Sequence, residues 1–261
     1  MPAIKRLKPK NFRKLSCSQC LDGAVLGFDF SMAFQPIVDI ASKQIFAQEA
    51  LVRGLAGEPA STVFESVNEE NLYRFDQNCR VKAIEIGSKF VSDSLISINF
   101  MPRAVYKPEL CIRTTLEAAE VFGFDPKRIM FEFNEAERVS DISHLKEIIE
   151  AYKQMGFKTA IDDFGSGYSG LNQLTEFKPD YLKLDMQLIR GIDSSFTRNS
   201  IVKSIVWLCA ELGIGVIAEG IETQDEKRAL LDLGITQQQG YLYAKPEFER
   251  LIGLDEIFHL S

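Results

Sequence analysis

The sequence predicts an α/β fold, namely a closed, TIM-like (β/α)8 barrel with one antiparallel strand. Short apolar runs alternate with amphipathic stretches from Met32 onward, a pattern typical of parallel strands linked by crossover helices. About eight such runs in a chain of 261 residues favour a closed barrel over an open sheet. The first two runs are separated only by Ala41-Ser42-Lys43, which is too short for a parallel crossover and therefore predicts an antiparallel hairpin.

The individual elements follow from these runs and from the helical periodicity between them. The expected strands are AFQPIVDI, QIFAQEALV, LISINF, RIMFEF, KTAIDDF, YLKLD, GVIAEG and ITQQQGYLYA. Amphipathic stretches predict helices over residues 76–91, 109–122, 141–154, 197–212 and 223–233. The fourth helix places Ile201, Ile205, Leu208 and Leu212 on one face, and Gly213 fits its C-terminal stop.

Composition and charge narrow the class of protein. Apolar residues make up 46% of the chain and charged residues 26%, which predicts a sizeable core and excludes a disordered chain. Acidic residues outnumber basic ones by 37 to 30, and this balance argues against a partner that is a nucleic-acid polymer. The first part of the chain is basic, and we expect residues 1–31 to form an N-terminal extension and cap and residues 32–261 to form the barrel domain. The basic arm is either a solvated extension or a contact for an anionic partner or membrane surface.

Neither a signal peptide nor a transmembrane segment is visible in the sequence, so we expect a cytoplasmic protein. The five cysteines are then expected to be reduced thiols. Cys17 and Cys20 have the spacing of half a zinc site, but no second CxxC motif exists. A zinc knuckle or redox switch therefore stays open beside the simpler interpretation of two free thiols.

Polar residues stand where the predicted strands end. In a barrel of parallel strands these ends converge on one mouth, so the side chains face each other across a small space. Each residue alone is equally well explained as a helix cap or a salt-bridge partner, and only the joint pattern favours a functional site. The residues are Glu49, Asn99, Glu132, Asp162, Asp163, Asp185 and Glu219.

Such a cluster needs cations, because neighbouring carboxylates repel one another and raise each other's pKa. Oxygen ligands without histidine or thiolate suit Mg²⁺ or Mn²⁺. The adjacent Asp162 and Asp163 indicate a ligand shared between two ions, an arrangement that can attack phosphodiesters. Lys183 lies inside an apolar strand, where an unpaired lysine is costly. We expect it to point into the mouth, where it polarises water, holds a phosphate oxygen or forms a structural salt bridge.

A glycine-rich segment, DDFGSGYSG, runs from Asp162 to Gly170. Its glycines permit unusual backbone angles and close approach. The segment is either an ordinary turn or a loop that joins metal ligands to substrate or to a neighbouring subunit. Its position directly after paired aspartates favours the loop.

Together these motifs resemble the EAL domain family, cyclic-di-GMP phosphodiesterases named for a Glu-Ala-Leu motif. Glu49-Ala50-Leu51 matches that motif and continues to Arg53. Further matches occur in family order over about residues 32–250, namely FQPIVD, SIN, FEFNE, DDFGSGYSGL, YLKLD, IAEGIET and QGYLYAKP. The fold of the family is a barrel with one antiparallel strand, in agreement with the short hairpin link.

The resemblance implies two Mg²⁺ or Mn²⁺ ions as cofactors. Ligands of one ion correspond to Glu49, Asn99, Glu132 and Asp162. Asp162 and Asp163 correspond to ligands of the second ion, with Glu219 on that ion or on its water. Lys183 corresponds to a contact with the water or the phosphate. Whether Glu219, Lys183 or the metals alone deprotonate the water stays open at this stage.

Other matching positions imply substrate contacts and supporting roles. The implied substrate contacts are Gln35, Leu51, Arg53 and Gln239, of which Arg53 suits a phosphate oxygen. Glu135 corresponds to an anchor for the glycine loop that contains Gly165 and Ser166, and Glu222 to an acid behind the metal ligands. The sequence departs from the family pattern at Met101, Asn134 and Gln187, none of which is a metal ligand.

The leading hypothesis is a hydrolase that opens cyclic-di-GMP to linear pGpG. One alternative is a catalytically silent EAL-like domain that binds cyclic-di-GMP or a protein partner, although such members typically lack metal ligands. Another is a two-metal phosphodiesterase barrel with a different substrate. The family often dimerises near the glycine loop and the next helix, so we expect a homodimer. We expect no sensor domain, and the regulatory signal is left to a protein partner, the basic arm, Cys17 and Cys20 or oligomerisation.

Overall fold

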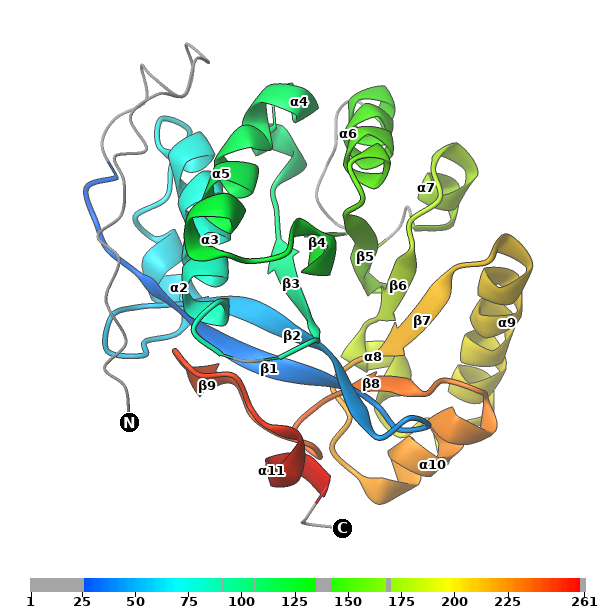
Figure 1. Cartoon of the computed structure of the whole chain (residues 1–261). Helices are drawn as coiled ribbons and strands as arrows, with labels where there is room; N and C mark the ends of the chain where they lie inside the picture. Colours follow the sequence, from blue (N-terminus) through cyan, green and yellow to red (C-terminus); the bar gives the residue numbers. More distant parts are fainter. Residues whose placement is uncertain (1–25, 91, 106, 135–141, 168–169, 259–261) are drawn as a thin grey trace.

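Eight strands close into a barrel in the computed structural model, which describes residues 26–90, 92–105, 107–134, 142–167 and 170–258. Neighbours around the ring follow chain order, and β1 closes it by pairing with both β2 and β8 (Figure 1). The strands are β1 (Ser31–Asp39), β2 (Gln44–Arg53), β3 (Leu95–Asn99), β4 (Ile129–Asn134), β5 (Lys158–Phe164), β6 (Tyr181–Leu184), β7 (Gly215–Ala218) and β8 (Gln237–Gln239). The eight predicted strands and the closed α/β barrel are confirmed.

The first strand runs against the rest. β1 is antiparallel to β2, with Gln35 opposite Glu49, and antiparallel to β8, with Ile37 opposite Gln239. The pairs from β2 to β8 around the ring are parallel. A ninth short strand, β9 (Glu247–Phe248), adds to β1 outside the ring. The link between β1 and β2 has four residues, 40–43, one more than predicted, and it has the predicted consequence of one antiparallel strand.

The helices surround this ring (Figure 1). Those that the structure describes are α2 (Ala60–Phe64), α3 (Leu72–Gly87), α4 (Pro108–Cys111), α5 (Arg113–Phe122), α6 (Ile142–Gln154), α7 (Gly170–Glu176), α8 (Met186–Ile189), α9 (Phe196–Leu212), α10 (Gln224–Asp232) and α11 (Leu254–Phe258), with 3-10 turns at Pro102–Ala104 and Pro126–Arg128. Each of the five predicted helices is present. The stretch 109–122 is nevertheless split into α4 and α5 at Ile112, and α3 begins four residues earlier than predicted.

One helix buries only part of the apolar face that its periodicity predicts, since Ile205 and Leu212 pack against the core. Gly213 ends α9 in the left-handed region, as predicted (φ +64°). Ile201, however, is 44% exposed, and together with Ile205 and Leu208 it lines an apolar groove on the surface. The pattern of α9 thus reports an apolar face but does not say whether the chain itself covers it.

Two further predictions concern a membrane-spanning helix and the N-terminal arm with its cysteines. No helix of the described residues has the length and apolar character needed to cross a membrane. The basic arm, Cys17 and Cys20 lie outside the described residues. Their predictions therefore stay predictions.

Candidate active site

Strand alternation builds the site in two layers inside the barrel. The lower layer is a buried apolar cluster of Ile37, Ala47, Met130, Ala160 and Ile217. Side chains two residues apart on a strand point to the same face. Two residues further along four of these strands lie the carboxylates Glu49, Glu132, Asp162 and Glu219. On antiparallel β1 the matching residue is Gln35, two residues before Ile37. Strand alternation therefore places a layer of polar side chains at the mouth, directly above a buried apolar layer.

Lys183 stands at the centre of these carboxylates. Its side chain is fully buried, and its Nζ lies 2.7 Å from Glu219 Oε1, 2.8 Å from Asp162 Oδ1, 2.9 Å from Glu132 Oε2 and 3.7 Å from Glu49 Oε2. Burial acts to lower its pKa, but the surrounding carboxylates dominate and raise the pKa well above its ordinary value. The predicted orientation of Lys183 is confirmed, and one buried cation faces four acids.

Burial, and after it the excess of negative charge, raises the pKa values of the carboxyl groups in the mouth. Burial raises the pKa of Glu132 to about 8, against the opposing effect of Lys183. Burial also raises the pKa of Glu219 well above its ordinary value. The pKa of Asp163 rises to about 6, first through burial and then through Asp162 and Asp185. The protein alone therefore does not stabilise all of these groups in the ionised form.

The carboxylate oxygens form two groups suited to divalent cations. One group is Glu49, Glu132 and Asp162, and the other is Asp162, Asp163 and Glu219; within each, one oxygen per residue lies within 4.8 Å of the others. Glu132 Oε1 is buried without a hydrogen-bond partner among the described residues. Asp162 belongs to both groups, as its predicted shared role requires. An all-oxygen set with an orphaned carboxylate atom fits hard cations such as Mg²⁺, Mn²⁺ or Ca²⁺.

Three amides complete the mouth beside Glu49. Asn99 Nδ2 donates to Glu49 Oε1 at 3.1 Å, and Gln239 Nε2 donates to Glu49 Oε2 at 2.7 Å. Gln239 Nε2 also lies 3.2 Å from Gln35 Oε1, while Gln35 Nε2 donates to the carbonyl oxygen of Ala244 at 3.1 Å. The structure therefore brings Gln35, Asn99 and Gln239 to the site, and the two contacts from Asn99 and Gln239 orient Glu49.

Two cavities open on either side of the carboxylates. One of about 570 Å³ contains Arg53, Asn99, Met101 and Asn134 in its wall, and one of about 310 Å³ contains Gln35, Glu219 and Gln239. Glu49, Leu51, Asp162 and Asp163 line both cavities. An elongated ligand would therefore have room on both sides of the carboxylate cluster.

Two predicted residues stand at the edge of this arrangement. The Arg53 guanidinium donates to the carbonyl oxygen of Val52 at 2.7 Å. This contact within β2 holds the Arg53 side chain in the wall of the larger cavity. Glu222 lines the smaller cavity, but its half-exposed side chain pairs with Arg190 at 2.8 Å. Glu222 is thus tied to the rim and makes no ion pair with Lys183 among the described residues.

The glycine loop leaves β5 directly after the paired aspartates. Gly165 has φ +98°, and a Cβ there would overlap the Leu188 side chain, so only glycine fits. Ser166 Oγ donates to the carbonyl oxygen of Asp163 at 2.8 Å, which ties the loop to the ligand strand. Glu135, the predicted anchor of this loop, lies outside the described residues.

Sequence reasoning missed some contributors to the site. Asn134 Nδ2 donates to Asp163 Oδ2, and Asp163 itself has φ +55°, an uncommon backbone conformation for a residue with a side chain. Buried Glu226 accepts hydrogen bonds from the backbone amides of Gly191 and Glu222 and thereby holds the rim of the smaller cavity. The T-x-x-E capping signature of α10 would have revealed Glu226, since its capping box with Thr223 is present.

Asp185 has a different position from the one expected for a member of the carboxylate cluster. Its side chain accepts a hydrogen bond from the backbone amide of Gln187 at 2.8 Å and caps α8. It lies in the wall of the smaller cavity and makes no ion pair with Lys183 among the described residues. For this residue the helix-cap alternative is the correct one.

Comparison with known proteins identifies relatives of this architecture. A family model described as EAL domain matches residues 20–246. Two Escherichia coli K12 proteins are 32% identical to the chain over 82% of its length: the blue light- and temperature-regulated antirepressor BluF and the probable cyclic di-GMP phosphodiesterase PdeI. The chain spans only 53% and 28% of their respective lengths.

Solved structures agree with these matches. A standalone versatile EAL protein from Vibrio cholerae O395, in its c-di-GMP-bound form, is 54% identical with a TM-score of 0.85, over 88% of this chain and 97% of that one. Klebsiella pneumoniae BlrP1, in a complex with manganese and cyclic diGMP, is 33% identical with a TM-score of 0.80, over 86% of this chain and 58% of that one. The predicted resemblance and fold are confirmed.

Proposed function

Because the chain belongs to the EAL domain family, we propose that it is a cyclic-di-GMP phosphodiesterase that produces linear pGpG with two bound Mg²⁺ or Mn²⁺ ions. The observation that carries the proposal is the pair of carboxylate groups around Lys183, which share Asp162. Support also comes from relatives whose names or complexes include cyclic-di-GMP.

The proposed metal ligands divide between the two carboxylate groups. Glu49, Asn99, Glu132 and Asp162 would hold one ion, and Asp162, Asp163 and Glu219 the other. Bound divalent cations supply charge neutralisation on phosphate oxygens and acidify water. The amide contacts to Glu49 keep that carboxylate oriented toward the mouth.

The reaction is the hydrolysis of one phosphodiester bond. A water oxygen attacks the phosphorus in line, the bond from phosphorus to the ribose 3′-oxygen breaks, and that oxygen leaves with a proton. Lys183, held by four carboxylates, is placed to orient the water or a phosphate oxygen, and Glu219 to accept the proton of the water. Gln35, Leu51, Arg53 and Gln239 are the proposed substrate contacts, because they line the cavities beside the cluster.

The direct test is turnover of cyclic-di-GMP by the purified protein, with and without metal. We expect pGpG in Mg²⁺ or Mn²⁺ and none in excess chelator, measured by liquid chromatography. Glu49→Ala should lose turnover because metal binding weakens, whereas Glu117→Ala, which removes an exposed carboxylate on α5, should not. Absence of pGpG with every divalent metal would overturn the proposal.

A binding module without hydrolysis is the second candidate, because one relative carries the name antirepressor. Every proposed ligand residue is present in this chain and lies in the mouth, which favours hydrolysis. Tight binding of cyclic-di-GMP combined with no metal-dependent cleavage would decide for the binding module.

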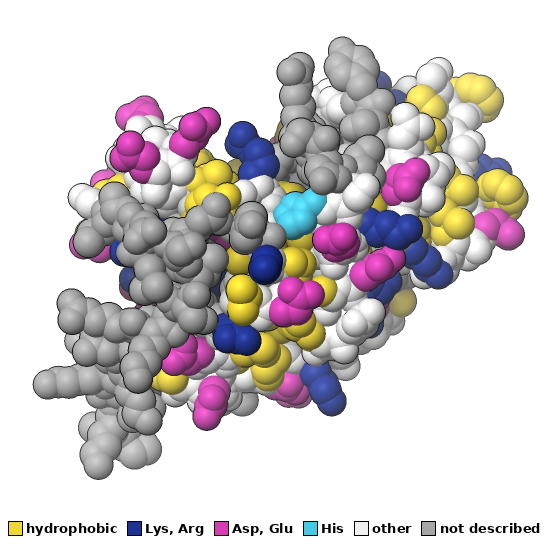
Figure 2. Space-filling view, turned by 90° about the horizontal axis from the view of Figure 1, so that it is seen from above, with side chains coloured by type: hydrophobic (Ala, Val, Ile, Leu, Met, Phe, Trp, Pro, Cys, Tyr) yellow, Lys and Arg dark blue, Asp and Glu magenta, His cyan; other side chains and the backbone are white. Residues whose placement is uncertain are grey.

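We also propose that the chain forms a homodimer through α7 and α9. Leu171, Phe196, Ile201 and Trp207 are between 44% and 87% exposed, and the first three line the apolar groove beside Phe164. Figure 2 shows hydrophobic side chains gathered at the right-hand end of the molecule, where α7 and α9 lie in Figure 1. Phe196→Asp should convert a dimer to a monomer in sedimentation experiments; a wild-type monomer would contradict the proposal.

A further inference from the structure

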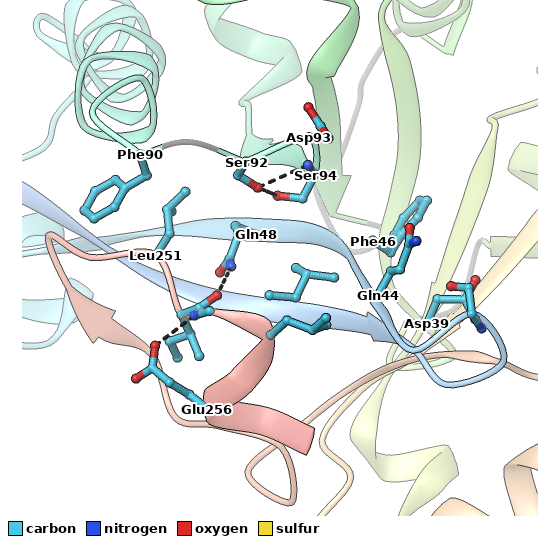
Figure 3. A pocket seen from close by; sticks show the side chains of 15 residues that line it. Asp39, Gln44, Phe46, Gln48, Phe90, Ser92, Asp93, Ser94, Leu251 and Glu256 are labelled. Atoms are coloured by element: carbon cyan, nitrogen blue, oxygen red, sulfur yellow. Dashed lines mark hydrogen bonds between the residues drawn. The ribbon is translucent and has the colours of Figure 1, made fainter. Parts of the chain in front are cut away.

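The proposed metal ligands of the mouth are held by the chain to different degrees. Glu49 lies inside β2, a strand of ten residues, and the adjacent Gln48 donates to the carbonyl oxygen of Ile252 at 2.8 Å (Figure 3). Glu219 instead lies one residue beyond β7, a strand of four residues that ends at Ala218. A side chain on a loop is held less precisely than one on a strand, so contacts to the loop after β7 decide where Glu219 points.

The loop after β7 turns sharply at Gly220. This glycine has φ +68°, and a Cβ there would lie only 2.4 Å from the Cβ of Met186 on α8, so no larger residue fits. Before the turn, the Glu219 amide donates to the last carbonyl oxygen of β6 at 3.1 Å. After it, the Ile221 amide donates to the last carbonyl oxygen of β8 at 3.1 Å. The loop is therefore attached to the ring on both sides, and the turn between these two contacts packs against α8.

Arg190, the residue directly after α8, joins that helix to the turn. Its Nη2 donates to the carbonyl oxygen of Gly220 at 3.0 Å and lies 2.8 Å from Glu222 Oε1. Its Nη1 donates to Oε1 of the buried Glu226 at 3.2 Å. Glu226 in turn accepts hydrogen bonds from the backbone amides of Gly191 and Glu222, each at 3.0 Å. The guanidinium fork thus bridges the carbonyl group in the turn and the acid that caps α10.

Arg190 holds the wall of the smaller mouth cavity from behind. It is absent from the lining of both mouth cavities. The two segments that it joins, the start of α8 and the loop after β7, do line the smaller cavity, through Asp185, Met186, Glu219 and Gly220. The contacts of Arg190 run to a backbone carbonyl group and to two acids. Arg190 is therefore placed to orient the wall without touching a ligand in the cavity.

We propose that Arg190 is a positioning residue for Glu219. By holding the carbonyl group of Gly220, it keeps that carboxylate within reach of the other two acids of its group, Asp162 and Asp163. The inference rests on the proposed function, in which these three acids hold the second ion. The fork is essential, because one end holds the turn and the other the acid on α10, whereas a lysine ammonium is a single point charge that cannot hold both. Without the fork, the glycine in the turn is free to adopt other backbone angles.

Binding of Mn²⁺ to the full chain without substrate tests this role independently of hydrolysis. Electron paramagnetic resonance measures free Mn²⁺ during a titration, and the wild-type chain should bind two ions. Arg190→Lys should weaken the binding of one ion by about tenfold, because residues behind metal ligands contribute roughly 10–100-fold to affinity, and should leave the other ion unchanged. Its melting temperature in chelator should change little, because lysine keeps the positive charge beside Glu222 and Glu226. Arg228→Lys, the same change at an exposed arginine on α10, should alter neither ion.

Turnover supplies a second measurement. In Arg190→Lys the Mn²⁺ concentration for half-maximal turnover should rise by about tenfold. The KM for cyclic-di-GMP in saturating Mn²⁺ should stay within about twofold of the wild-type value, because Arg190 does not line the cavities. Should Arg190→Lys fail to fold, Glu226→Gln, which removes the charge that Arg190 pairs with, should weaken the same ion.

The outcomes separate this inference from the proposed function. Unchanged Mn²⁺ binding in Arg190→Lys, equal weakening of both ions, or the same loss in Arg228→Lys would overturn the role of Arg190. A wild-type chain that binds fewer than two Mn²⁺ ions would overturn both this role and the two-ion mechanism. Two bound ions without formation of pGpG by the wild-type chain would overturn the proposed function alone.

Discussion

Two buried cations in this protein have opposite surroundings. Arg80 is almost fully buried and faces one carboxylate, Asp76, while its Nη1 donates to the Tyr152 hydroxyl at 3.0 Å. Its guanidinium also lies over the rings of Phe100 and Phe131. Lys183 is equally buried but faces four carboxylates. The first cluster is balanced in charge without any ligand, and the second is not. This difference separates a structural ion pair from a carboxylate cluster whose excess negative charge the proposed metal ions would balance.

The balanced cluster also supports the mouth. Asp76 Oδ1 accepts a hydrogen bond from the backbone amide of Met101 at 2.9 Å, two residues beyond Asn99. The ion pair on α3 therefore holds the chain that follows β3. Breaking the Arg80–Asp76 pair should lower stability more than activity. Breaking the carboxylate cluster around Lys183 should lower activity more than stability.

The largest effect on stability is expected from Arg80→Met. The change leaves the Asp76 carboxylate buried without its partner and should lower the free energy of unfolding by about 3–5 kcal/mol. Urea denaturation measures this loss. The double variant Asp76→Asn/Arg80→Met, which keeps an acceptor for Met101, should lose much less. A double variant as unstable as Arg80→Met alone would show that the charge is not the cause.

The opposite pattern is expected from Asp162→Asn. Asp162 belongs to both carboxylate groups, so its loss should lower turnover by more than about a hundredfold, since even residues that only orient metal ligands contribute 10–100-fold. Because the change also removes one of several competing acids, the melting temperature in chelator should not fall. A large loss of metal-free stability would place Asp162 with the structural ion pairs.

Removal of metal should make stability depend on pH. The pKa of Glu132 rises from its ordinary 4.5 to about 8 in the folded chain, so folding favours its protonated form. In chelator the free energy of unfolding should therefore fall as pH rises from about 4.5 to about 8, because the folded state binds more protons than the unfolded state over that interval. Thermal melts across this range measure the slope. Mn²⁺ should reduce the slope, and so should Glu132→Gln in chelator; an unchanged slope in that variant would exclude Glu132 as the cause.

A smaller effect is expected from Asn134→Ala. This change removes the hydrogen bond that orients Asp163 but no proposed metal ligand. The Mn²⁺ concentration for half-maximal turnover should rise about tenfold, with little change in stability. Asn78→Ala removes an exposed asparagine on α3, whose Nδ2 donates to the carbonyl oxygen of Arg74 at 2.8 Å, and serves as the matched control. Equal metal requirements for the two variants would remove Asn134 from the positioning residues.

The parts of the fold and of the candidate site that the sequence predicts are those in which residues alternate regularly along a strand. Ala47 and Glu49, like Met130 and Glu132, are two residues apart, and strand alternation places both members of each pair inside the barrel. The short link after β1 predicts the antiparallel hairpin because a connection of so few residues is too short for a parallel crossover. The site was predictable because its residues stand at corresponding points of successive strands.

The parts missed depend on contacts between distant segments. Asp76 and Arg80 have the spacing of an ordinary surface ion pair on a helix, and only Tyr152, 72 residues from Arg80, shows that the pair is buried. Helix α8 has four residues, too few to display a helical period. The apolar face of α9 is partly exposed, at Ile201, although its spacing is the same as that of a core helix. No local pattern in these segments distinguishes the alternatives.

The closing strand determines when the candidate site can form during synthesis. β1 pairs with β8, and the hydrogen bond from Gln239 to Gln35 joins residues 204 positions apart. Glu49 likewise receives its hydrogen bond from Gln239, 190 positions later in the chain. The N-terminal part of a growing chain leaves the ribosome first. The edge of β1 that pairs with β8 therefore stays unpaired until β8 has also left the ribosome. Nascent chains that stop before β8 therefore carry the EAL motif but lack a closed ring and the amide that orients Glu49.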